Sequence, residues 1–264
     1  MAIVGRRSRG LRVFVVAAAA LLCASAVHAA PVAVRVREGT AHGFVDFFDG
    51  DTRIANGELV QFPRDGGRIE NRLTIGFEDG SFYEETLTFS QERFFRLHTY
   101  RLVQRGPSFP ETADVSFDDG GAYEARVTKR GKSAETDKGH VDVPADVYNG
   151  LASTLLKNLG PGETAEVHTL AFTPKPRLLD AKLTPQGETR FAIGSAMRVA
   201  TKYRVAFHLA GLAGVAAMLI GKDPPDVYYW IVGGPAPTFV RFEGPLTADG
   251  PVWRGELGAP RWAR

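Results

Sequence analysis

Short turns built on aspartate and glycine recur along the first half of the chain and limit its possible folds more than any other feature. Each turn is flanked by β-branched or aromatic residues. Glycine supplies the positive φ angles that tight hairpins need, so such turns join antiparallel neighbours. They predict an antiparallel meander without βαβ units, and they stand at Asp49–Gly50, Asp65–Gly67, Asp79–Gly80 and Asp119–Gly121.

The segment between two of these turns alternates between apolar and polar residues. From Arg68 to Phe77, apolar side chains occupy one parity and mostly charged or hydroxyl side chains the other. This pattern is typical of a strand with one buried face and one solvated face. The stretch from Arg93 to Gln104 has apolar residues at both parities, which predicts a strand covered by other elements.

One helix is expected, over residues 144–159. Val147, Leu151, Leu155 and Leu159 recur every four residues, which gives an apolar stripe. Pro144 suits a first helical turn, and Gly160 suits the position after the last one. The sequence therefore predicts a mainly β fold, an antiparallel barrel or strongly curved half-barrel with one packed α-helix at about 144–159.

The chain begins with the features of a secretory signal peptide. Four arginines precede an apolar run over residues 13–27, and small residues follow at Val27 and Ala29. We expect cleavage after Ala29, with residues 1–29 as signal peptide and residues 30–264 as one β-rich domain that is periplasmic or secreted. Cys23 does not favour lipidation, because Leu22 stands where a small residue is normal.

Removal of this leader changes the charge and the cysteine content. The chain holds 32 basic and 30 acidic residues, and the leader takes four arginines and no acid, so the mature part is slightly acidic. A nucleic-acid partner therefore lacks electrostatic support. The single cysteine also lies in the leader, so stability must come from burial and not from disulfides.

A nearly all-apolar stretch spans residues 210–221. A helix needs about 20 residues to cross a bilayer, so this stretch is too short to span one. We interpret it as a buried helix or an apolar loop, which serves as plug, lid or peripheral membrane contact.

Motifs for catalysis, metals and nucleotides were not found. No serine elbow occurs, the nearest P-loop fragments lack required residues, and the mature histidines form no metal-binding pair. Asp46, Asp49 and Asp51 could suit a hard cation, but their spacing does not match a calcium-binding loop, and hairpin-turn chemistry explains Asp49 and Asp51 without an ion. We expect no catalytic residue, metal or cofactor, although a site assembled from distant strands remains an alternative. The sequence favours a non-enzymatic role without deciding it.

Adjacent aromatic residues recur along the predicted strands. A strand alternates faces, so one member of each pair points inward, into either a solid core or a cavity. The favoured hypothesis is a cavity for a hydrophobic small molecule or lipid. The alternative is a structural or interaction protein of the periplasm with a solid core. The candidate ligand-binding residues are Phe94, His98, Leu151, Leu155, Leu212, Val215, Leu219, Ile220 and Trp230.

The order of these features resembles an uncharacterised family of exported bacterial β proteins, a domain of unknown function. The resemblance rests on Asp142-Val143-Pro144 at the start of the helix, Gly160-Pro161-Gly162 after it, and a late Tyr229-Trp230-Ile231 strand. More loosely, the architecture is similar to the half-barrel with a helix in periplasmic lipoprotein carriers. That similarity implies a concave apolar surface for acyl chains, although no arginine pair here matches a carrier site.

Overall fold

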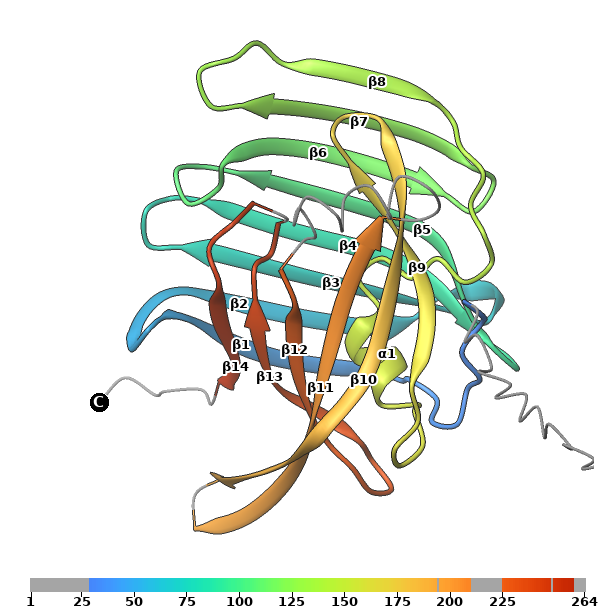
Figure 1. The fold of residues 1–264 in the computed structure, drawn as a ribbon, viewed down its shortest axis with the longest axis vertical. Coiled ribbons are helices and arrows are strands. Elements are labelled where there is room, and N and C mark those ends of the chain that lie inside the picture. Colours follow the sequence, from blue (N-terminus) through green and yellow to red (C-terminus); the bar gives the residue numbers. More distant parts are fainter. Residues whose placement is uncertain (1–28, 194, 210–224, 248, 259–264) are drawn as a thin grey trace, which may run out of the picture.

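The computed structural model describes residues 29–193, 195–209, 225–247 and 249–258 (Figure 1). The predicted signal peptide, apart from Ala29, and the apolar stretch 210–221 lie outside these residues. None of the described helices has the length and apolarity that crossing a membrane requires.

Within the described residues, fourteen strands form one antiparallel sheet with a single α-helix, which confirms the predicted mainly β fold class. The first eight strands are β1 (Ala41–Asp49), β2 (Thr52–Pro63), β3 (Arg68–Phe77), β4 (Phe82–Gln91), β5 (Phe95–Arg105), β6 (Glu111–Asp118), β7 (Ala122–Lys129) and β8 (Glu135–His140). After α1 (Ala152–Leu156) come β9 (Ala165–Phe172), β10 (Pro176–Ile193), β11 (Ala196–Leu209), β12 (Val227–Val232), β13 (Thr238–Gly244) and β14 (Trp253–Gly258). A short 3₁₀ turn, Asp65–Gly67, joins β2 to β3.

The sheet is a meander in which every chain neighbour is a sheet neighbour except β8 and β9. The first and last strands pair with each other, with Phe44 opposite Gly258. Gly50 and Gly80, in two of the predicted hairpin turns, have φ angles of 57° and 83°. The free edges are thus the two strands that flank the helical segment, and the sheet is a curved half-barrel that is not closed by hydrogen bonds.

The sheet curls over on itself, so that β9–β13 pass across β2–β6 in the view of Figure 1. Its open side is bridged by side chains. The ring of Phe172, at the end of β9, lies 5.9 Å from that of Phe117 and 6.0 Å from that of Tyr123. Phe172 also packs on a small apolar cluster of β6 and β7. Aromatic packing therefore joins the two ends of the sheet.

The helix is much shorter than the predicted range 144–159, because the residues before it pair with β9 instead. Val147 forms a parallel bridge with His168, and the side-chain amide of Asn149 both donates to Leu170 O and accepts from Leu170 N, each at 2.8 Å. Gly150 then has a φ of +71°, which an α-helix does not allow. The apolar stripe is nevertheless buried at Val147, Leu151 and Leu155.

An N-terminal arm, residues 30–39, crosses the open side near α1. Ala30 N donates to Glu166 O of β9, and Phe95 N of β5 donates to Val32 O of the arm, each at 3.0 Å. The Asn158 side chain, just after α1, accepts the amides of Arg35 and Val36 at 2.7 Å each. The arm therefore ties β5, β9 and the helix together.

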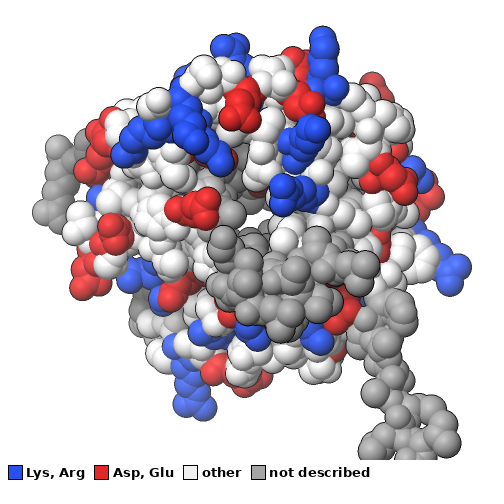
Figure 2. Space-filling model, turned by 45° about the horizontal axis from the view of Figure 1, so that its top comes forward, with Lys and Arg blue, Asp and Glu red and all other residues white. Residues whose placement is uncertain are grey.

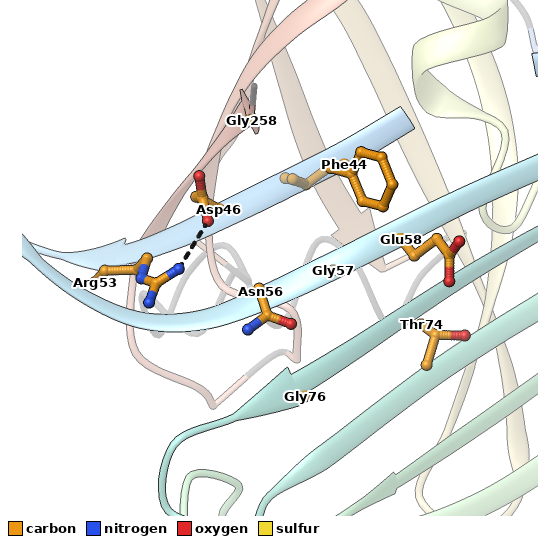
Figure 3. Close-up of a pocket in the computed structure, with 10 residues that line it drawn as sticks. Phe44, Asp46, Arg53, Asn56, Gly57, Glu58, Thr74, Gly76 and Gly258 are labelled. Carbon is orange, nitrogen blue, oxygen red and sulfur yellow. Dashed lines mark hydrogen bonds and ion pairs between the residues drawn. The ribbon is translucent and has the colours of Figure 1, made fainter. Parts of the chain in front are cut away.

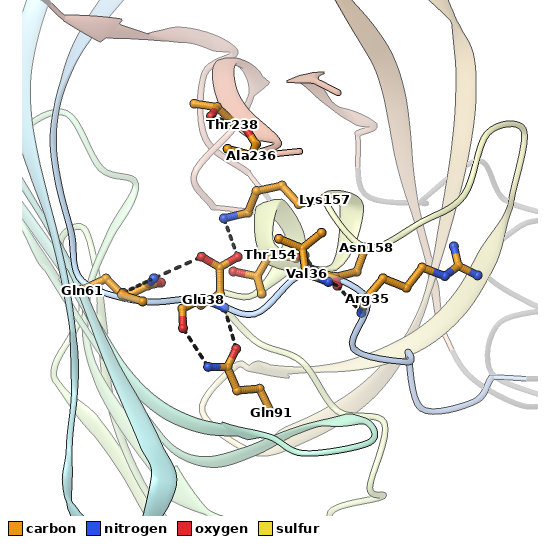
Figure 4. A network of polar contacts seen from close by, with 11 residues as sticks. Arg35, Val36, Glu38, Gln61, Gln91, Thr154, Lys157, Asn158, Ala236 and Thr238 are labelled. Carbon is orange, nitrogen blue, oxygen red and sulfur yellow. Dashed lines mark hydrogen bonds and ion pairs between the residues drawn. The ribbon is translucent and has the colours of Figure 1, made fainter. Parts of the chain in front are cut away.

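The end of this arm is held by a network of polar side chains around Glu38 (Figure 4). Gln91 exchanges two hydrogen bonds with the Glu38 backbone, at 2.6 and 2.7 Å. Gln61 donates to Glu38 Oε2 at 3.1 Å. Lys157 Nζ lies 2.5 Å from Glu38 Oε1, which makes an ion pair although the direction is not that of a hydrogen bond. Both charged side chains are largely withdrawn from solvent.

Candidate ligand-binding cavity

The concave side of the curved sheet lines a partly open cavity of about 370 Å³. Its wall comes from β1–β5, β9–β14, the Tyr148–Leu155 segment and the loop after β13. The wall is mainly aliphatic and aromatic, with Phe47, Phe207, Phe239 and Phe242 among the rings. A cavity of this size and lining is typical of sites for small apolar ligands.

One carboxyl group interrupts this apolar wall. Glu85 of β4 lines the cavity and is partly buried. The Tyr100 hydroxyl of β5 donates to Glu85 Oε1 at 2.7 Å. Burial raises the pKa of Glu85, while hydrogen bonds from Tyr100 and Tyr83 act in the opposite direction. We call Glu85, Tyr83, Tyr100 and Tyr229 the Glu85 cluster.

The three tyrosines of this cluster stay protonated at physiological pH. Burial raises the pKa of Tyr83 and of Tyr100 well above 10, and the neighbouring Glu85 carboxyl raises both further. Burial and Glu85 also raise the pKa of Tyr229 on β12, across the cavity. The phenols therefore act as neutral hydrogen-bonding groups.

No lysine or arginine is present among the described residues of the cavity wall. The other ionisable group besides the tyrosines and Glu85 is His168, whose Nδ1 lies 2.9 Å from Asp146 Oδ1 and whose Nε2 lies 3.3 Å from Asp180 Oδ1. Its two ring nitrogens thus already have carboxylate partners. The Glu85 carboxyl group thus has no lysine or arginine beside it in the described wall.

Strand geometry explains how the cluster forms. Tyr83, Glu85 and Leu87 alternate along β4, so all three point to the concave face. In β5 a bulge interrupts the pairing, since Thr88 lies opposite Thr99 but Phe89 lies opposite Leu97. The extra residue lets both Leu97 and Tyr100 face inward. Gly150, at the turn before α1, permits the close approach to Glu85, because a Cβ there would lie 2.9 Å from Glu85 Cδ.

The predicted ligand-binding residues are distributed over several places. Leu155 lines the cavity, and Leu151 is fully buried beside the same turn. Phe94 precedes β5 and is 40% exposed, with the guanidinium of Arg93 over its ring. Leu212, Val215, Leu219 and Ile220 lie outside the described residues.

The structure places His98 and Trp230 on the convex side of the sheet. His98 is the extra residue of the β5 bulge, and its ring nitrogens contact Asp119 Oδ2 at 2.8 Å and Ser90 Oγ at 3.0 Å. Trp230 Nε1 donates to Thr189 Oγ1 at 3.3 Å, and Lys202 lies over its ring. Neither side chain lines the cavity.

Sequence reasoning missed the Glu85 cluster. The signal that was present is the parity of β4, where Glu85 shares a face with Tyr83, Leu87 and Phe89. An acidic residue at an inward parity between large apolar residues is a candidate for function, because buried carboxylates are rare without a partner.

A second hollow, of about 410 Å³, lies on the convex face of β1–β3 (Figure 3). It exists because Gly76 and Gly258 have no side chains there, and its rim carries Phe44, Asn56 and charged residues. Asp46 lies 3.4 Å from Arg53, and Glu58 lies 2.6 Å from His42. Each acidic side chain of this hollow thus contacts a guanidinium or imidazole group, unlike the Glu85 carboxyl.

Acidic and basic side chains are interspersed on the face in Figure 2. Within the described ranges, no group of three His, Cys, Asp or Glu side chains is arranged to hold a metal ion.

Comparisons with known proteins identify no related protein. No protein-family model matches the chain, and no curated protein or solved structure shows significant similarity to it. The resemblance to exported β proteins and to lipoprotein carriers stays a prediction.

Proposed function

We propose that this protein binds a single hydrophobic ligand, such as a lipid or a lipid-like small molecule, in the cavity of its curved sheet. The observation that carries the proposal is the partly open, mainly apolar cavity of about 370 Å³ on the concave side of the sheet. A structural protein with a solid core would have filled this space with side chains, because protein interiors are close-packed. The cavity therefore favours binding over the structural alternative.

The proposed site of action is the cell envelope or the exterior. The predicted leader over residues 1–29 supports export, and the single cysteine of the chain lies within that leader. An exported protein with an apolar cavity is suited to the transport or storage of molecules that are poorly soluble in water.

Fluorescence titration with N-phenyl-1-naphthylamine, an uncharged apolar probe, tests the proposal. We expect saturable enhancement with the protein comprising residues 30–264. Leu73→Trp enlarges a side chain on the cavity wall and should weaken probe binding about tenfold or more, which corresponds to about 1.4 kcal/mol. Thr74→Trp is the matched control, because Thr74 follows Leu73 on β3 and faces the convex side.

The two variants are compared only after circular dichroism shows native folding. If Leu73→Trp does not fold, Leu102→Trp on β5 replaces it, since Leu102 also lines the cavity. Equal probe binding by wild type, cavity variants and Thr74→Trp would overturn the proposal.

A further inference from the structure

We propose that the cavity selects a ligand whose apolar body ends in a primary amine, with the Glu85 carboxylate as its counter-ion. This inference rests on the proposed function, and it identifies the chemical class of the ligand. Three features of the Glu85 cluster and its surroundings carry it.

The first feature is the missing cation. Glu85 receives its hydrogen bonds from phenols, and no lysine or arginine accompanies it among the described wall residues. Buried carboxylates in proteins are usually paired, because an unpaired one loses its hydration without compensation. An ammonium group on the ligand supplies the missing charge. A carboxylate or phosphate head group would place two anions together whenever Glu85 is ionised.

The second feature is the aromatic surroundings of the carboxyl group. Tyr83, Tyr100 and Tyr229 come from three different strands and all interact electrostatically with Glu85. Ring faces attract cations, and the attraction grows when water is excluded. Two of these phenols also hydrogen-bond the carboxyl group, Tyr100 at 2.7 Å and Tyr83.

The third feature is the rigidity of the cluster. The turn Tyr148–Gly150 lies against Glu85, and Asn149 is fixed by its two hydrogen bonds to the Leu170 backbone. The Tyr148 hydroxyl donates to Phe95 O at 2.8 Å, which anchors the start of the same turn. The carboxyl group is thus held in place before a ligand arrives, which lowers the entropy cost of binding.

Binding is coupled to one proton. When Glu85 is protonated, entry of an alkylammonium ion releases that proton, and the product is a carboxylate–ammonium pair. The affinity for an amine should therefore rise with pH through the pKa of Glu85. The other titratable groups of the wall are the tyrosines, which stay protonated in this range, and His168 with its partners Asp146 and Asp180.

Displacement of N-phenyl-1-naphthylamine by three ligands of equal chain length tests the inference. Decylamine should displace the probe at a concentration about tenfold lower than decanoate does. Glu85→Gln keeps the shape of the side chain but removes its charge. It should weaken the binding of decylamine about tenfold and change the binding of 1-decanol by less than about twofold relative to the wild type. Glu84→Gln, the adjacent convex-face acid, should change none of the three.

Measurements of decylamine affinity at several pH values separate the contribution of Glu85 from that of His168. From about pH 5 to about pH 8, decylamine affinity should rise in the wild type and in His168→Gln, and it should stay flat in Glu85→Gln. Equal displacement by decanoate and decylamine, or an equal loss for all three ligands in Glu85→Gln, would overturn the inference and leave the proposed function standing. Absence of probe binding to the wild type would overturn the proposed function itself.

Discussion

The hydroxyl group of Tyr100 donates a 2.7 Å hydrogen bond to Oε1 of Glu85, across neighbouring strands of the sheet. In the register of β4 and β5, Glu85 lies opposite Leu102, so Tyr100 is its diagonal neighbour. Long side chains reach each other across this diagonal. The bulge at His98 sets the parity of Tyr100, and it therefore decides that a phenol and a carboxyl group meet at the concave face.

Glu85 should make the stability of the protein depend on pH. Burial raises its pKa in the folded state, so the folded protein holds this proton more tightly than the unfolded chain does. The contribution of Glu85 to stability is fully present below the unfolded pKa and is lost as pH rises through the folded pKa. Relative to Glu85→Gln, the wild type should therefore lose unfolding free energy as the pH rises from about 5 to about 8.

Urea unfolding at several pH values measures this difference. Groups shared by both proteins, including Glu111 with its raised pKa, cancel in the comparison. Glu84→Gln serves as the control and should follow the wild-type curve. Parallel curves for wild type and Glu85→Gln would show that the carboxyl group titrates as it does in the unfolded chain.

Asn149 completes the free edge of β9 as a further strand would. Its side-chain amide makes both hydrogen bonds to the Leu170 backbone, and the group is buried. Asn149→Ala leaves two buried backbone groups without partners, so we expect a loss of about 2–4 kcal/mol. Asn56→Ala, on the exposed face of β2, should change stability by less than about 0.5 kcal/mol. Chemical denaturation of both variants gives the values, and similar small losses would contradict this role.

Gly150 should tolerate alanine much less well than another glycine of similar conformation. Its φ is +71°, and an added Cβ would meet Leu87 Cδ2 and lie 2.9 Å from Glu85 Cδ. Gly162 has a φ of +73°, with no atom within 4 Å of such a Cβ. Gly162→Ala measures the cost of the left-handed conformation alone, about 1 kcal/mol. Gly150→Ala adds overpacking and should cost about 3 kcal/mol or more in thermal or urea unfolding. Equal losses of stability in Gly150→Ala and Gly162→Ala would show that the turn at Gly150 adjusts to the added methyl group without overpacking.

Local sequence signals predicted the sheet well, because hairpin turns and alternation depend on neighbouring residues. Gly80 and the parity of Ile69 and Ile75 are examples, since each follows from a few adjacent positions. The extent of the helix was overestimated for the opposite reason. The four-residue spacing correctly marked Val147 and Leu151 as buried. It could not reveal that Val147 pairs with β9, because that pairing joins residues far apart in the sequence.

The site was harder to predict, because its members come from strands that meet only in the folded sheet. Glu85 and Tyr229 stand 144 positions apart in sequence and face the same cavity. The aromatic pairs suggested an apolar interior, but which residue of each pair points inward depends on bulges such as those at His98 and beside Trp230. A single-residue bulge reverses the parity, and composition does not reveal it.

The ion pair between Lys157 and Glu38 should stabilise the attachment of the N-terminal arm far more than a surface pair would. The Lys157 side chain is 16% exposed and that of Glu38 is 9% exposed, with Nζ 2.5 Å from Oε1. Lys157→Met keeps most of the aliphatic length but leaves the Glu38 carboxylate with the amide of Gln61 as its side-chain partner (Figure 4). An unpaired buried charge costs about 3–5 kcal/mol, so we expect a loss of about 3 kcal/mol.

The exposed pair Arg101–Asp114 is the matched control, because its atoms lie 3.0 Å apart but both side chains are more than half exposed. Arg101→Met should cost less than about 1 kcal/mol. The double variant Lys157→Met, Glu38→Gln should recover part of the loss, since the stranded charge is gone. Hydrogen exchange at the Val34 and Phe95 amides, which join the arm to β5, reports whether the arm loosens first. A loss in Lys157→Met no larger than in Arg101→Met, with unchanged exchange at both amides, would mean that the arm is held by its backbone contacts alone.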